Sequence, residues 1–154
     1  MKNQEQSIEV LNTLIEINNN RIEWYETASN EIKNTELKDM FFQFVQTSKK
    51  CITELISEVL QLGGVPTKEP TTSGKFFRAW IDVKAALIND DFKEILNSCE
   101  YGEYVAVSMY KKILTDKLKY LNADQQYLLN KQYVFLKADH DKVREMKDML
   151  VEYK

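Results

Sequence analysis

The residues that break helices are concentrated in one short stretch of this chain. Both prolines lie between Gly63 and Ser73, in the segment VPTKEPTTSGK, and only four glycines occur in 154 residues. Proline and glycine are the residues least compatible with a helix interior, so segments without them can continue as long helices. Their distribution therefore predicts long helices on both sides of one central link.

Apolar residues recur at intervals of three and four on both sides of this link, which is the spacing of one face of an α-helix. The stripes predict four long helices and a short one within a crossover of residues 63–90. The long helices are expected over residues 4–32, 35–62, 91–117 and 122–153, and the short helix over residues 75–88. Asn34 can cap the second helix, and Gly63 and Gly64 can end it.

The lengths of the connections indicate how these helices are arranged. Short turns join the first two long helices and the last two, so each pair should form an antiparallel hairpin. The long crossover then joins the two hairpins, which is the connectivity of ferritin-like bundles. We therefore predict an all-α, ferritin-like four-helix bundle that forms a single domain over residues 1–154.

Composition and charge exclude several classes of function. The net charge is −3 and the pI is about 5.3, so no nucleic-acid partner is expected. Apolar runs are too short to span a bilayer or to form a signal peptide, so no membrane association is expected either. Two cysteines, Cys51 and Cys99, are too few for a disulfide framework. The sequence predicts a cytoplasmic protein with reduced thiols.

A polar residue occupies the middle of each apolar stripe when the helices are turned by about 100° per residue. These residues are Asn18, Ser48, Glu103 and Asp139, one on each long helix and each near its midpoint. Because a helix rises by about 1.5 Å per residue, the four should meet at a similar height. The sequence therefore predicts a polar layer across the interior of the bundle.

The two acids of this layer, Glu103 and Asp139, need a partner, because an unpaired buried carboxylate is costly. A metal ion, a shared proton, or a hydrogen-bond network through the layer, Tyr25, Tyr110 and water would each serve. Arg21, at the edge of the first stripe, would join such a network if its side chain turned inward. We favour a satisfied polar network that fixes the register of the helices. A metal site and an open polar pocket for a small ligand are the alternatives.

Five segments, spread over nearly the whole chain, carry a family resemblance. They read NNNRIEWYETA, LISEVLQLGGVP, GKFFRAWIDVKAAL, ILNSCEYGEYVAVSMYKKIL and KADHDKV. Through them the chain resembles the ferritin-like superfamily and, more narrowly, a bacterial group of that fold known only as a domain of unknown function. The resemblance implies the bundle fold and brings no established activity with it.

The resemblance also identifies where a di-iron centre would lie. The superfamily uses one Glu on each of two helices and Glu-x-x-His on each of the other two. The corresponding positions here are Asn18, Ser48, Cys51, Glu103, Leu136 and Asp139, with Lys137 and His140 replacing the last two if the register shifts by one. Only Glu103 matches fully, and without bridging carboxylates two cations would repel each other. A dinuclear centre is therefore not expected. A single Fe, Mn or Zn ion bound by Glu103, Asp139 and His140 is the alternative.

Three aromatic residues crowd the short helix of the crossover, Phe76, Phe77 and Trp80. They can cover one side of the bundle, or they can form an exposed patch that binds a second subunit. A homodimer or a complex with another protein would follow from the second arrangement.

These observations favour a ferritin-like bundle protein that is not an enzyme. Its di-metal site would be degenerate, it would need no cofactor, and it would act through protein association. The alternative function is a metal-binding or oxidoreductase-like protein that uses the carboxylates in the middle of the bundle.

Overall fold

The structure, a computed structural model, describes residues 2–71 and 74–152. Its described part contains helices and connecting segments and no strand, which confirms the predicted all-α class. The helices are α1 (Lys2–Glu31), α2 (Thr35–Gln61), α3 (Gly74–Ile88), α4 (Phe92–Asp116) and α5 (Ala123–Glu152), with a 3₁₀ turn, η1 (Leu118–Tyr120), between the last two.

The helices begin and end close to the residues that the sequence indicates. Asn34 accepts a hydrogen bond from the amide of Leu37 and so caps α2, and Asp91 caps α4 through the amide of Glu94. At the other end of α2, Gly63 has a φ of +79° and the amide of Gly64 donates to the carbonyl of Val59. This left-handed termination is the kind that glycine permits. The predicted end of the last helix at residue 153 lies outside the described residues.

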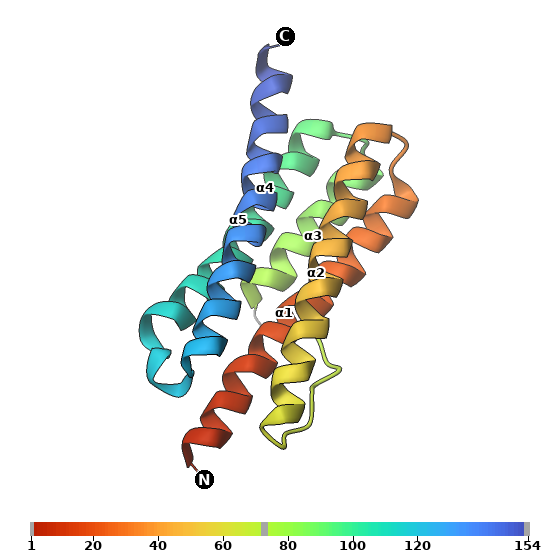
Figure 1. Cartoon of the computed structure of the whole chain (residues 1–154). Helices are drawn as coiled ribbons and strands as arrows, with labels where there is room; N and C mark the ends of the chain where they lie inside the picture. Colours follow the sequence, from red (N-terminus) through yellow and green to blue (C-terminus); the bar gives the residue numbers. More distant parts are fainter. Residues whose placement is uncertain (1, 72–73, 153–154) are drawn as a thin grey trace.

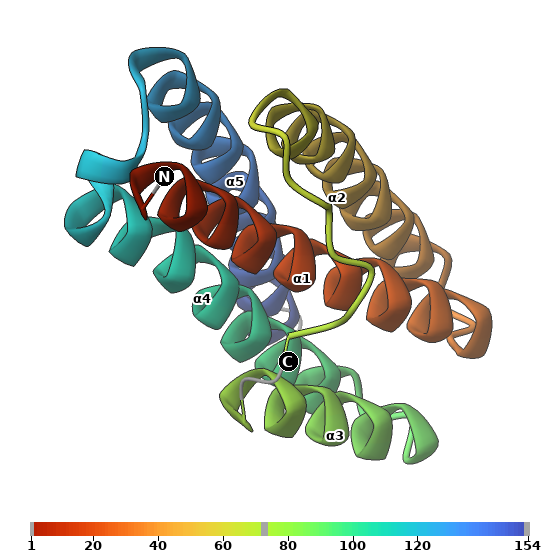
Figure 2. The ribbon, with the colours of Figure 1, turned by 90° about the horizontal axis from the view of Figure 1, so that it is seen from below.

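The long helices form two hairpins that pack against each other. Figure 1 shows α1 and α5 running in one direction and α2 and α4 in the opposite direction, with α1 beside α2 and α4 beside α5. The link that follows α2 runs back along the bundle, and α3 continues in that direction before the chain turns into α4. Figure 2 shows α3 at the periphery of the molecule, next to α4.

Asparagine side chains of α1 hold the link that follows α2. Asn12 donates to the carbonyl of Val65 (3.1 Å) and accepts from the amide of Thr67 (2.9 Å). Two turns further along α1, Asn19 donates to the carbonyl of Glu69 (3.1 Å) and Asn20 accepts from the amide of Thr71 (2.6 Å). Residues 62–71 of the link form no helix or strand, so these bonds satisfy backbone groups that would otherwise need water.

Two of the three aromatic residues of α3 are buried within the chain. The Trp24 ring of α1 stacks on Trp80 with centroids 5.3 Å apart and contacts Phe76 at 4.4 Å. Phe76 and Trp80 therefore cover the bundle, and an exposed patch made of all three aromatics does not form. Phe77 alone among the three is exposed. The reason is geometric, because Phe77 lies about 100° around the helix from Phe76 and faces outward.

None of the helices in residues 2–71 and 74–152 is both long enough and apolar enough to cross a membrane.

Candidate functional site

The centre of the bundle is occupied by the guanidinium group of Arg21, which α1 places completely out of contact with solvent. Its Nε donates to Glu103 Oε2 (2.9 Å) and its Nη2 to Glu103 Oε1, so that the pair is bidentate. Nη1 donates to Ser48 Oγ (2.6 Å), and Nη2 also donates to Asp139 Oδ2 (3.0 Å). A single side chain thus joins α1 to α2, α4 and α5.

Two aromatic rings lie close to the guanidinium of Arg21. Its Cζ atom lies 5.6 Å from the centre of the Tyr25 ring and 5.7 Å from the centre of the Phe44 ring. The two rings also contact each other edge to face, at 5.1 Å. Rings at this distance attract a cation through their negative faces and exclude water from it. The two rings therefore strengthen the ion pairs that Arg21 forms.

Burial and pairing act in opposite directions on the ionisation of these groups. Burial by itself lowers the pKa of Arg21, but the charge and hydrogen bonds of Glu103 outweigh it, so the pKa is raised and the guanidinium stays charged. Burial raises the pKa of Asp139 to about 6, since the attraction of Arg21 offsets the loss of solvation only in part and the charge of Glu103 adds to it. One cation therefore faces two carboxyl groups, and Asp139 takes a proton more readily than an ordinary aspartate does.

A second polar cluster lies beside the first and also connects all four long helices. Asn18 donates to the hydroxyl of Tyr110 (3.0 Å), which donates to Gln132 Oε1 (2.8 Å). Gln132 in turn donates to the carbonyl of Cys51 and to the side chain of Glu54, each at 3.3 Å. The donors follow one another in one direction across the bundle, so each bond can polarise the next.

The structure divides the predicted polar layer between these two clusters. Ser48, Glu103 and Asp139 come together, but around Arg21 rather than around each other. Asn18, predicted to share their height, bonds instead to Tyr110 and to the carbonyl of Leu14. The physical reason is that the long arginine side chain fills the space among the two acids and the hydroxyl.

Of the two candidates on the last helix, Asp139 faces the interior and His140 does not. Nδ1 of His140 lies 3.6 Å from a carboxylate oxygen of its neighbour Asp141, at the edge of the bundle. The three proposed metal ligands, Glu103, Asp139 and His140, are thus not gathered at one point. In the part of the chain that the structure describes, no three His, Cys, Asp or Glu side chains are placed to hold a metal ion.

Arg21 lies at the centre of the bundle, although the sequence predicted it at the edge of the first apolar stripe. A usable signal was present, because Arg21 follows Asn18 by three residues and precedes Tyr25 by four, and both of these were assigned to the interior. Residues three or four apart share one helix face. Two buried acids that need a cation, together with one arginine on the inner face, would have predicted the pair.

The two cysteines offer no reactive thiolate. Both are buried, with no disulfide. Burial raises the pKa of Cys51 to about 12, and burial together with the charge of Glu103 raises that of Cys99 further. Because the thiolate is the nucleophile and the metal ligand, both side chains are inert in this state.

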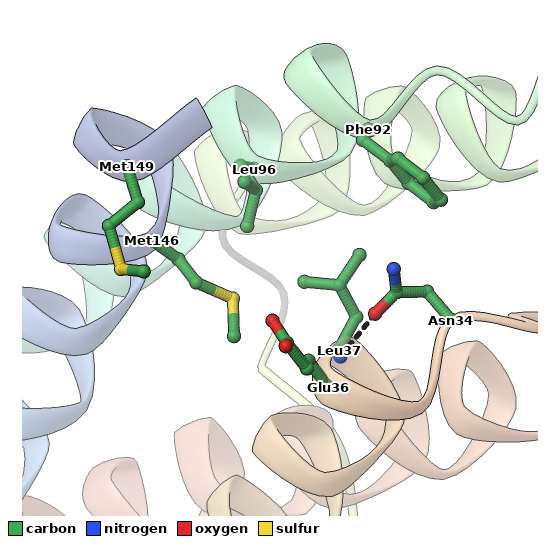
Figure 3. A pocket seen from close by; sticks show the side chains of 7 residues that line it. All are labelled: Asn34, Glu36, Leu37, Phe92, Leu96, Met146 and Met149. Atoms are coloured by element: carbon green, nitrogen blue, oxygen red, sulfur yellow. Dashed lines mark hydrogen bonds between the residues drawn. The ribbon is translucent and has the colours of Figure 1, made fainter. Parts of the chain in front are cut away.

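A separate, small pocket lies at the end of the bundle where α2 and α4 begin and α5 approaches its end (Figure 3). Its volume is about 110 Å³. Most of its lining is apolar, and the described residues that line it are Asn34, Glu36, Leu37, Phe92, Leu96, Met146 and Met149. Asn34 is already bonded to the amide of Leu37, as the dashed line in Figure 3 shows. Glu36 is the only ionisable group among these residues, so the pocket contains no pair of groups for acid–base chemistry.

The fold and site together define an all-helical bundle protein whose centre holds a salt-bridged guanidinium. The chain belongs to the family described as Domain of unknown function (DUF2383), whose model matches residues 6–116. The match extends through α4 and includes Arg21, Ser48 and Glu103 of the central cluster, while Asp139 lies beyond it. Among curated proteins, none matches the chain.

Proposed function

We propose that the protein is a ferritin-like bundle in which an arginine takes the place of the metal centre, and that it acts through protein association and not through catalysis. The ferritin-like assignment is supported by the helix directions, by the long crossover, and by the meeting of residues from all four long helices at mid-height. In the superfamily, that position is where carboxylates and histidines bind metal.

The observation that carries the proposal is the set of groups around Arg21. A guanidinium has five N–H donors and no lone pair for a metal, and it keeps its charge at any physiological pH. It uses four of its N–H groups on Glu103, Ser48 and Asp139. A divalent ion at the same point would have to displace a fixed positive charge from its two counter-ions. The residues present therefore do not fit a di-metal centre.

The same groups are poorly suited to acid–base or nucleophilic chemistry. Glu103 is engaged at both oxygens, and Cys51 and Cys99 are held as neutral thiols. Asp139 can exchange a proton, but it faces Arg21, which cannot accept one. A network of this kind fixes one register of the four helices, which is the best-attested use of buried polar residues. The predicted cytoplasmic location, with both thiols reduced, is part of this proposal.

Metal analysis tests the central claim. The protein would be produced in medium supplemented with iron, manganese and zinc, and its metal content measured beside that of a Glu103→Gln variant. We expect no metal above the level of the variant, and no change in the thermal unfolding midpoint after treatment with a chelator. Stoichiometric metal that disappears in Glu103→Gln would refute the proposal and support the metal-binding alternative.

A further inference from the structure

Helix α3 has a second apolar stripe on the side that faces away from the bundle. Phe77, Ile81 and Ile88 are 64%, 48% and 83% exposed, and their spacings of four and seven residues place them on one side of the helix. The opposite side is the one that packs on the chain; its buried residues are Phe76, Ala79, Trp80, Val83 and Ala86. A surface helix of a monomer needs only one apolar face, so this helix has one more than the fold uses.

The stripe is accessible along the length of α3. Figure 2 shows α3 at the edge of the molecule, in contact with α4 on one side and uncovered on the other. Ala85 lies beside the stripe and is also exposed, so a small side chain is available there to pack against a large one. Contiguous exposed apolar side chains of this kind mark sites of association.

We propose that the stripe is covered by α3 of a second copy of this chain, packed antiparallel about a two-fold axis that passes close to Ile81. This inference rests on the part of the proposed function that assigns the protein to association, and it names the partner. At about 1.5 Å per residue, Ile81 then meets the partner's Ile81, and Phe77, four residues away, meets the partner's Ala85. A large side chain is thus paired with a small one on both sides of the axis.

The charges beside the stripe are complementary to those of a second copy in this direction. Arg78 and Asp82 lie one turn apart on the same flank of the stripe, both are exposed, and neither forms an ion pair within the described part of the chain. In an antiparallel two-fold pair the same flank of each helix meets its copy. Arg78 then faces the partner's Asp82 and Asp82 the partner's Arg78.

The other flank is compatible with the same arrangement. Lys84 holds its ammonium 5.5 Å from the Trp80 ring of its own chain, and so away from its copy. The surface is therefore self-complementary in the antiparallel direction, which is the property of an isologous dimer interface.

Sedimentation equilibrium over a concentration series tests the inference with the full chain. We expect the wild type to reach the mass of a dimer reversibly, because one helix pair forms a small interface. Ile81→Lys, which places two ammonium groups at the axis, should leave a monomer at every concentration. Val134→Lys, a change at an apolar residue of α5 that is also exposed, should dimerise like the wild type. Circular dichroism checks that each variant is folded.

A charge exchange tests the direction of packing. Arg78→Asp and Asp82→Arg should each weaken the dimer at least several-fold, since each brings like charges together, and the double variant should restore it. A wild-type monomer at all concentrations, a dimer unaffected by Ile81→Lys, or a double variant no better than the single ones would overturn the inference. Metal analysis is independent of these results. A metal-free monomer would refute the proposed dimer and would still agree with the proposal about Arg21.

Discussion

Arg21 is the residue on which the interior of the bundle depends. Its counter-ions lie on two other helices, at Glu103 and Asp139, and its third partner, Ser48, on a fourth. Removing both charges of a buried ion pair can be neutral, but removing one leaves the other without a partner in a medium of low polarity. The arginine and the glutamate therefore stabilise the fold only as a pair.

Loss of the guanidinium should be among the most damaging single changes in the chain. We expect Arg21→Ala to lower the free energy of unfolding by about 3–5 kcal/mol, because it leaves Glu103 buried without its cation. Arg21→Lys keeps the charge but cannot form the bidentate contact, so it should recover only part of the loss. Urea unfolding measures both. Arg144→Ala, at an exposed arginine of α5, is the control and should change stability by less than about 0.5 kcal/mol.

A second prediction at this scale concerns pH. Burial raises the pKa of Asp139 from 3.8 to about 6, so in this range the native protein holds a proton that the unfolded chain has released. Stability from this group must then decrease as the pH rises through the window between the two pKa values, by about 2–3 kcal/mol in total.

Comparison with Asp139→Asn isolates this contribution from that of the other acids. Between about pH 4 and about pH 7, the unfolding free energy of the wild type should fall relative to that of the variant. A difference that is independent of pH would show that Asp139 titrates alike in the folded and unfolded chain.

At the scale of the helices, the sequence was sufficient to predict where the long helices begin and end, because few of the local cap and breaker signals conflicted. Asn34 and Asp91 cap helices in the structure as their residue types favour, and Gly63 takes the left-handed conformation. The 3₁₀ turn Leu118–Tyr120 was not predicted, since its sequence contains neither a cap residue nor a breaker.

The residues at the centre of the bundle were harder to predict from the sequence, because the role of Arg21 depends on a long side chain that reaches across to three other helices. Stripe geometry places Cβ atoms and says little about where a flexible side chain ends.

The end of α2 offers a test of how closely two elements approach. A Cβ atom added at Gly64 would lie 2.8 to 3.0 Å from three side-chain atoms of Ile8 on α1. Since a β-branched side chain has few other rotamers, Gly64→Ala should cost about 1–3 kcal/mol through overpacking.

Gly74→Ala supplies the matched control, because nothing lies within 4 Å of the position that its Cβ would take. The same denaturation experiment should show this variant close to the wild type. Equal effects at both glycines would mean that the contact between Ile8 and the end of α2 is loose.

At the scale of the whole molecule, polar and aromatic contacts join parts that lie far apart in the sequence. The two buried polar clusters each join all four long helices, and the asparagines of α1 hold the link that crosses between the hairpins. The stacking of Trp24 on Trp80 joins α3 to the bundle in the same way. The crossover should therefore unfold together with the bundle and not as a separate unit.

The two tryptophans provide a direct probe of that cooperativity. Trp24 and Trp80 are stacked with their planes 6° apart and their centroids 5.3 Å apart, close enough for their electronic transitions to couple. We expect an exciton couplet in the ultraviolet circular dichroism of the native protein, absent from Trp80→Phe, which keeps an aromatic ring at that place. During thermal unfolding the couplet should disappear with the same midpoint as the helical signal, since α3 is held by the core of α1. Earlier loss of the couplet, while the helical signal persists, would instead show that α3 detaches from a bundle that remains folded, and the crossover would then be a mobile cover.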